Sequence, residues 1–468
     1  MTTFRSLAIA SLFVAATACG SADNATTVAD PATATPTASA DDGGGWIDGA
    51  PEWDAGAEDA SGEEFSADAS AAPAATDAAS DTASDAAAVP DEGDLSTEGY
   101  AQDQPTLRAG SVDDNADFAG YLEYAERIAG LEISTRPFDA TGRIVVTVTG
   151  SNGLPAAGVP VIVTVTVEGA GRSIGTVRTT ANGTARFLPA LYGAADISEF
   201  SFTVGEVTAS AAPGGSAALN LSTPGGPAQG AVALDVLFLL DATGSMGDEI
   251  DRLKTTIDQV AKRVAAFETR PDVRFAFTLY RDEGDLFVST TFDFTGDIDV
   301  FRTALLDVVA DGGGDYPEAV EEGLAAALAE PAWRDPASTL QLIFLVGDAP
   351  PRLDRQVPVP YPDALVDAVA RGIKVIPIAS SESDDQAEAV FRQIALATGA
   401  RFVFLSYGAA GAATGGSSDI AATDYEEMAL DQLIVRLISE ELAALTGSAP
   451  EPIGPIAPTT TATNPIGQ

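Results

Sequence analysis

The chain has 468 residues, room for about three domains, and a net charge of −45 from 69 acidic and 24 basic residues. A charge of this size and sign repels the phosphates of nucleic acids, so we expect no nucleic-acid partner. Histidine is absent and Cys19 is the only cysteine. These counts exclude a Ser-His-Asp triad, imidazole or multi-thiolate metal sites, and disulfides within the chain.

Residues 1–19 are predicted to be a lipoprotein signal peptide. Arg5 precedes an apolar run from Leu7 to Ala16 that is too short to span a membrane. The run Ala-Thr-Ala-Cys that ends at Cys19 resembles a bacterial lipobox, which implies lipidation of that cysteine. We therefore expect a membrane-anchored lipoprotein of the bacterial cell envelope, either periplasmic or at the cell surface. Ordinary cleavage that leaves a free thiol is the alternative.

Two segments are too poor in large apolar side chains to fold alone. Residues 20–117 are mostly Ala, Asp, Ser, Thr, Gly and Pro, which predicts a disordered acidic linker. Residues 448–468, rich in Pro and Thr, are predicted to be a disordered tail. After the linker, apolar residues at helical spacing predict an amphipathic helix over residues 118–131. These apolar residues are Phe118, Tyr121, Leu122, Ala125 and Ile128.

Residues 132–222 change to the period of β-strands. Residues 144–149 and 159–167 are β-branched runs, and Asn-Gly pairs at 152–153 and 182–183 favour turns. Further strands are expected at residues 173–180, 184–188, 200–209 and 217–221. Short strands with frequent turns predict an all-β sandwich. The segments GLPAAGVPVIVTV and TTANGTARF resemble sequences of bacterial immunoglobulin-like and carboxypeptidase-regulatory-like modules. This resemblance indicates a stalk or spacer without catalytic or metal-binding residues.

Residues 231–447 are predicted to form a doubly wound, Rossmann-like α/β domain. The run from Val232 to Asp241 is almost wholly apolar, as in a central strand buried on both faces. Helical and strand patterns then alternate to the closing helix near residues 424–446. Residues 273–280 and 286–294 are joined tightly enough to form a hairpin, which supplies one antiparallel edge strand.

The central strand ends in a set of oxygen-bearing side chains. Asp241, Thr243 and Ser245 alternate along the loop that follows the strand, so their oxygens can converge at its carboxyl end. One carboxylate and two hydroxyls suit a hard cation, Mg²⁺ or Mn²⁺, better than zinc.

The pattern Asp-x-Thr-x-Ser resembles the metal-ion-dependent adhesion site of von Willebrand factor type A (VWFA) domains. Two later segments strengthen the resemblance: the sequence from Asp311 to Ala319, DGGGDYPEA, and the strand that ends at Asp348 and continues as Ala-Pro-Pro. The wording is closest to the hemicentin-like branch. The resemblance implies a metal site formed by Asp241, Thr243, Ser245, Asp315 and Asp348.

One position departs from the family pattern. The middle ligand of the family is usually a Thr, and the loop of residues 311–315 has none. Either Asp315 takes that position, or Gly314 does and a water completes the shell. We favour Asp315 as a ligand; capping of the helix that follows is its alternative role.

The resemblance implies a non-enzymatic function, cell adhesion or another protein–protein interaction. A Glu or Asp carboxylate of a protein partner would complete the metal shell, while the N-terminal lipid would hold the chain at a membrane. A structural envelope scaffold with a degenerate metal site is the main alternative. A metal-dependent phosphoryl hydrolase is less favoured, because the chain has neither a phosphate-binding Gly-Lys loop nor a His base.

Overall fold

The computed structural model describes residues 107–453 except residues 132, 168, 227–231, 381–382, 407–424 and 426. Cys19, the predicted signal peptide, most of the predicted linker and most of the predicted tail lie outside the described residues. In the part of the chain that is described, no helix is both long enough and apolar enough to cross a membrane.

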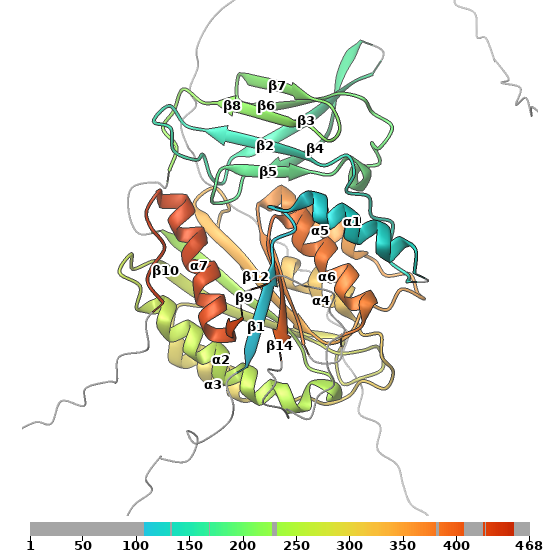
Figure 1. Ribbon diagram of the computed structural model, residues 1–468. Coiled ribbons are helices and arrows are strands. Elements are labelled where there is room, and N and C mark those ends of the chain that lie inside the picture. The colour runs from blue at the N-terminus through green and yellow to red at the C-terminus, as the bar shows by residue number, and fades with distance from the viewer. Residues whose placement is uncertain are drawn as a thin grey trace, which may run out of the picture. The chain divides into compact units, whose positions relative to one another are not determined.

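An eight-stranded mixed sheet forms the core of the larger region (Figure 1). Its order is β11-β10-β9-β12-β13-β14-β1-β15, and the five strands from β10 to β14 in that order run parallel to one another. The strands are β1 Arg108–Val112, β9 Ala233–Asp241, β10 Asp272–Tyr280, β11 Ser289–Thr295, β12 Thr339–Gly347, β13 Lys374–Ala379, β14 Phe402–Ser406 and β15 Met428–Ala429. The predicted central strand is β9, which lies between β10 and β12.

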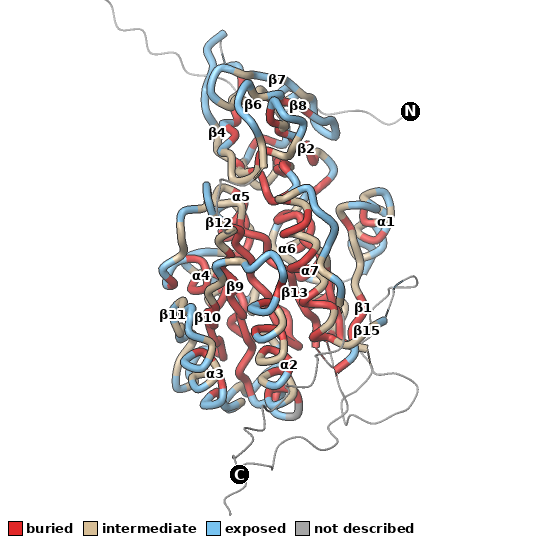
Figure 2. Tube along the Cα trace, turned by 90° about the vertical axis from the view of Figure 1, so that its left-hand side faces the viewer, coloured by how far each residue is buried: buried red, intermediate tan, exposed pale blue. Residues whose placement is uncertain are grey.

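Helices cover both faces of this sheet (Figure 1). One layer holds α2, α3 and α7, which contact one another through α2, and the other holds α4, α5 and α6. Their bounds are α2 Gly247–Ala265, α3 Ile298–Leu306, α4 Val320–Ala329, α5 Tyr361–Arg371, α6 Asp385–Thr398 and α7 Leu430–Thr446. The strands between the layers are buried on both faces (Figure 2), as their continuous apolar sequences require. The predicted mixed α/β fold is confirmed.

The far edge of the sheet differs from the sequence-based prediction. Strand β1 pairs antiparallel with β14 and with the short β15, so the sheet has antiparallel strands at both edges and not at one. The prediction of a disordered linker over residues 20–117 is therefore wrong for residues 108–112, which form a strand. Their sequence, RAGSV, has neither alternating polarity nor large apolar side chains, so it gives no signal of a strand. The strand forms because its backbone pairs with β14.

The predicted helix is α1, Phe118–Ala129, and it packs on the sheet region. Tyr121 and Tyr124 are its buried residues, and the Arg392 guanidinium of α6 lies 3.6 Å from the Tyr124 ring centroid. Arg392 also pairs with Asp114, just before the helix, at 2.5 Å. These contacts attach residues 114–129 directly to helix α6 of the α/β region.

The second region, between α1 and β9, contains two sheets, β5-β2-β8 and β4-β3-β6-β7. Side chains from both sheets form one apolar core. The elements are β2 Ile144–Thr149, β3 Pro160–Val167, β4 Ala170–Arg178, β5 Thr184–Phe187, η1 Pro189–Tyr192, β6 Phe200–Val204, β7 Val207–Ala211 and β8 Ser216–Asn220. The strand expected at residues 200–209 is a hairpin that turns at Gly205, whose φ is 57°. The resemblance to immunoglobulin-like modules stays a prediction.

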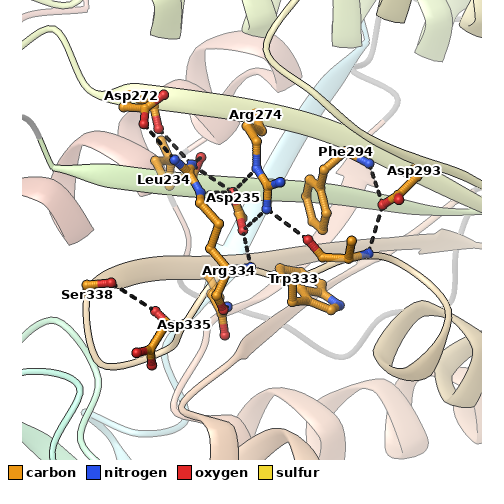
Figure 3. A network of polar contacts seen from close by, with 12 residues as sticks. Leu234, Asp235, Asp272, Arg274, Asp293, Phe294, Trp333, Arg334, Asp335 and Ser338 are labelled. Carbon is orange, nitrogen blue, oxygen red and sulfur yellow. Dashed lines mark hydrogen bonds and ion pairs between the residues drawn. The ribbon is translucent and has the colours of Figure 1, made fainter. Parts of the chain in front are cut away.

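A buried acid near the amino end of β9 anchors three segments of the chain (Figure 3). Asp235 is fully buried and accepts hydrogen bonds from Arg274 of β10 at 2.8 Å and from the Arg334 Nε at 2.8 Å. Arg334, in the loop before β12, also donates to the backbone carbonyl of Leu234 at 2.8 Å. Because both arginines depend on one carboxylate, this network fixes the amino ends of the central strands.

Asp235→Asn should therefore destabilise the fold strongly. It leaves Arg274 without its counter-ion and Arg334 with only the exposed Asp272, and losses of about 3–5 kcal/mol follow when one partner of a buried ion pair is removed. Denaturant unfolding measures the change. The control is Asp299→Asn, whose carboxylate is 84% exposed and pairs with Arg302 at 3.4 Å, so the expected loss is under about 1 kcal/mol. Equal losses for the two variants would contradict this assignment.

Candidate metal centre

Three of the predicted site residues lie together where β9 ends. Asp241 is the last residue of the strand and is fully buried. Its Oδ1 accepts hydrogen bonds from the Thr243 backbone N–H at 2.9 Å and from the Thr243 hydroxyl at 2.6 Å. The Ser245 hydroxyl, in the turn η2 Gly244–Met246, is 3.1 Å from the Thr243 hydroxyl. The alternating spacing thus places one carboxylate and two hydroxyls at one point.

The fourth residue, Asp348, comes from the neighbouring strand. β12 runs parallel to β9 with Val346 opposite Leu240, so the two strands end side by side. Asp348 follows directly and is 5% exposed. A glycine must precede it, because a Cβ at Gly347 would lie 2.3 Å from the buried Tyr280 hydroxyl.

Asp348 is close enough to affect the ionisation of Asp241. Burial, and next the negative charge of Asp348, raise the pKa of Asp241 to about 7. Asp241 Oδ2 is buried and has no hydrogen bond of normal geometry within the described residues, although the Tyr280 hydroxyl is near enough to lower the pKa. A nearby cation would offset this repulsion.

Asp315 is placed elsewhere. Its Oδ1 lies 2.5 Å from Arg352, and its side chain is 59% exposed. The hydrogen bond and the charge of Arg352 lower the pKa of this carboxyl group. The same guanidinium also binds Asp282 at 2.5 Å. Asp315 stays a predicted ligand, but it would have to leave Arg352 to reach an ion beside Asp241. The alternative position, Gly314, brings no side chain.

The structure adds a residue that the sequence analysis passed over, Glu318. It is 4% exposed, and its Oε1 is 3.1 Å from the position that a Cβ on Gly313 would occupy. The same position is 3.3 Å from the Thr243 Cβ. Gly313 therefore lies between the Glu318 carboxyl group and the loop of residues 241–245, which is called the metal loop below. Glu318 lies two residues before α4, which starts at Val320. The only sign of this residue in the sequence is an acidic residue directly after Pro317, close to the glycine-rich loop.

Burial raises the pKa of Glu318 to about 9, and the next largest cause is the charge of Asp241, followed by Asp282 and Asp348. Its Oε2 is buried without a hydrogen-bond partner within the described residues. Oε2 of Glu318 is therefore desolvated without compensation, whereas Oδ2 of Asp241 has the Tyr280 hydroxyl nearby. Such groups are costly unless a ligand or ion meets them.

The loop of residues 311–315 is fixed against the metal loop by backbone contacts. The N–H of Asp311 donates to the carbonyl of Ala242 at 3.0 Å, and the N–H of Gly244 donates to the carbonyl of Gly312 at 3.1 Å. Asp285, from the β10–β11 connection, accepts the Gly313 N–H at 2.8 Å. Gly312 and Gly313 have φ angles of 80° and 72°, which only glycine adopts without strain.

The donor set fits a divalent cation. All its atoms are oxygens, two of the donors are carboxylates, and the hydroxyls are already oriented by Asp241. Among the described residues no three Asp, Glu, His or Cys side chains are gathered so that they alone hold a metal. The hydroxyls of Thr243 and Ser245 are therefore needed for the shell. A hard cation bound there would supply positive charge and exchangeable water positions.

Residues 235–406 match the family model described as von Willebrand factor A domain. Together with the sheet topology, this match supports a von Willebrand factor A domain in that part of the chain. Alpha-protein kinase vwkA of Dictyostelium discoideum is 31% identical over 119 residues, which are 25% of this chain and 18% of that protein. The chain thus spans under a fifth of that relative, and the match does not extend kinase activity to it.

Two kinds of solved structure are also similar. Proximal thread matrix protein 1 from the mussel byssus, in a form with a zinc-occupied MIDAS motif, has 17% identity and a TM-score of 0.29 over 35% of this chain and 39% of that chain. The pilus adhesin SpaC from Lactobacillus rhamnosus GG, in its open conformation, has 12% identity and a TM-score of 0.28 over 43% and 29%. TM-scores this low carry no argument about function.

The raised pKa values predict how stability depends on pH. An acid whose pKa is higher in the folded state stabilises the fold below its unfolded value, 4.5 for Glu318, and this contribution is lost as the pH rises through about 9. With a metal chelator present, the melting temperature of the wild type should therefore decrease as the pH is raised from about 5 to about 9. Glu318→Gln should make this decrease smaller.

General repulsion among the acidic residues gives a similar trend, so a matched variant is needed. Glu283→Gln removes the same charge from a side chain that is 71% exposed, and it should leave the slope nearly unchanged. Identical slopes in the wild type and both variants would contradict the assignment of a buried, repelled acid at residue 318.

Proposed function

We propose that this chain is a divalent-cation-dependent protein-binding module, acting in adhesion or another protein–protein interaction. The observation that carries the proposal is the pair of buried carboxylates, Asp241 and Asp348, at the ends of two adjacent parallel strands. Two hydroxyls stand beside them, and Asp241 Oδ2 has no normal hydrogen-bond partner. A cation relieves this repulsion and is left exposed to an incoming ligand.

Each residue has a definite task in this proposal. Asp241 and Asp348 supply the negative charge that attracts the ion. Thr243 and Ser245 offer neutral oxygens, which leave part of the cation's charge uncompensated. Mg²⁺ and Mn²⁺ are the favoured ions because every donor is oxygen. The partner would contribute a Glu or Asp carboxylate, and Asp315 would join the shell only after releasing Arg352.

The location is proposed from the sequence. Lipidation at Cys19 would place the chain in a bacterial cell envelope, with the acidic segment after it as a tether. The hemicentin-like wording of the three loops supports an extracellular or periplasmic binding role and not catalysis. A structural scaffold with a degenerate metal site is the competing proposal, and the ion pair between Asp315 and Arg352 favours it.

Asp241→Asn should abolish metal binding and preserve the fold. The amide keeps the size of the side chain and removes the repulsion from Asp348. With a chelator present, the variant should therefore melt at the same temperature as the wild type or at a higher one. Calorimetric titration of the full chain with Mg²⁺, Mn²⁺ and Zn²⁺ is the measurement, together with metal-dependent thermal stabilisation.

Arg302→Gln is the control, since it changes one charge on α3 away from the site. It should bind metal like the wild type. Failure of the wild type to bind any of the three ions would reject the adhesion-site proposal and favour the scaffold. Equal binding by Asp241→Asn would move the metal site away from β9.

A further inference from the structure

Glu318 is held at the metal loops by its own backbone. Its N–H donates to the carbonyl of Pro350 at 3.0 Å, and its carbonyl accepts from the N–H of Arg352 at 3.0 Å. Residues 350–352 follow the strand end that carries Asp348. The position of Glu318 is therefore coupled to the same loop as one of the two site carboxylates, and also to the first residue of α4, Val320, whose N–H donates to the Glu318 carbonyl at 2.9 Å.

The side chain of Glu318 has no electrostatic partner that explains its burial. The three nearby arginines bind other groups: Arg281 binds the carbonyls of Ala242 and Val309, Arg352 binds Asp282 and Asp315, and Arg355 binds Glu283 and Glu322. No ion pair to Glu318 occurs within the described residues, and its Oε2 has no hydrogen bond there. A buried carboxyl group used only for packing would more economically be an apolar side chain.

The direction of the carboxyl group points to the metal loop. Only the space beside Gly313 lies between Glu318 Oε1 and Thr243, and Asp241 is the charged residue that affects Glu318 most. Any side chain at residue 313 would fill this space. Glycine at this position leaves room between the Glu318 carboxyl group and the Thr243 side chain, whose Cβ and methyl carbon are its atoms nearest to that space.

We propose that Glu318 is an internal carboxylate ligand, which occupies the metal position that an acidic partner would otherwise take. This inference rests on the proposed metal site. Glu318 would reach the ion by turning its side chain or through one water, since the three acids are not gathered as a group by themselves. A divalent cation and the three carboxylates of Asp241, Asp348 and Glu318 together carry a net charge of −1.

This charge sets the behaviour of the site. The ion is held tightly, because a third carboxylate strengthens the binding of a hard cation. A partner carboxylate is disfavoured, because it meets an overcompensated ion and must displace Glu318. The domain is thus self-inhibited towards acidic partners until Glu318 moves away.

The test uses the full chain and two substitutions at one residue. Glu318→Gln keeps the size of the side chain and removes its charge, and Glu318→Thr offers a hydroxyl in place of the carboxylate. Calorimetry with Mn²⁺ should give a dissociation constant at least about tenfold higher for Glu318→Gln than for the wild type. Glu283→Gln, a neighbouring exposed acid, is the matched control and should change it less than about twofold.

Acetate is the probe for the second part. It is added to each chain loaded with Mn²⁺, and its displacement of metal-bound water is followed by water-proton relaxation. The half-saturating acetate concentration should be at least about tenfold lower for Glu318→Thr than for the wild type.

The outcomes separate this inference from the proposed function. Unchanged Mn²⁺ affinity in both Glu318 variants, with binding lost in Asp241→Asn, overturns the internal ligand and leaves the metal site standing. Weaker Mn²⁺ binding with unchanged acetate affinity overturns the self-inhibition. Absence of Mn²⁺ binding in the wild type overturns both. Circular dichroism and melting curves check that each variant is folded.

Discussion

The parallel pairing of β9 with β12 is the constraint on which the rest of the metal centre depends. Its register brings the last residues of both strands to the same edge of the sheet, so Asp241 and Asp348 become neighbours although 107 positions separate their numbers. The pairing is stable because both strands are apolar along their length and lie between two helix layers. The carboxylates are thus brought together, against their repulsion, by hydrophobic burial and backbone hydrogen bonds.

Strand β9 treats its two buried acids in opposite ways. Near its amino end, Asp235 is matched by Arg274 and Arg334, and every contact within that network is made by the chain itself (Figure 3). At its carboxyl end, Asp241 faces another carboxylate, and one of its oxygens has no normal hydrogen bond. The first arrangement balances its charges within the chain, and the second leaves the repulsion that the proposed cation would relieve. This contrast within one strand separates an end that stabilises the fold from the end proposed to bind metal.

Sequence patterns predicted the elements that have strong periodicity, and they failed where the chain is specified by its partners. The apolar run before Asp241, the hairpin of β10 with β11 and the closing helix α7 were all found close to where they were expected. Strand β1 was missed because small, polar residues form a strand there only by pairing with β14. The site was harder to predict. Asp241, Thr243 and Ser245 are close in sequence, so spacing was sufficient. The positions of Asp315 and Glu318 depend on Arg352 and on the loop after β12, which no local pattern encodes.

Strand β1 also determines how a pull on the N-terminal side would travel through the molecule. The chain enters the α/β sheet at β1, leaves it to form the two smaller sheets, and returns at β9. If the N-terminus is tethered as proposed, tension would therefore reach the pair of β1 with β14 before it reached the two-sheet region. In an antiparallel pair the hydrogen bonds lie across the strand direction. A pull along β1 would shear all of them together, whereas a pull from its end would open them in sequence, and the angle of attachment would decide the mechanical strength.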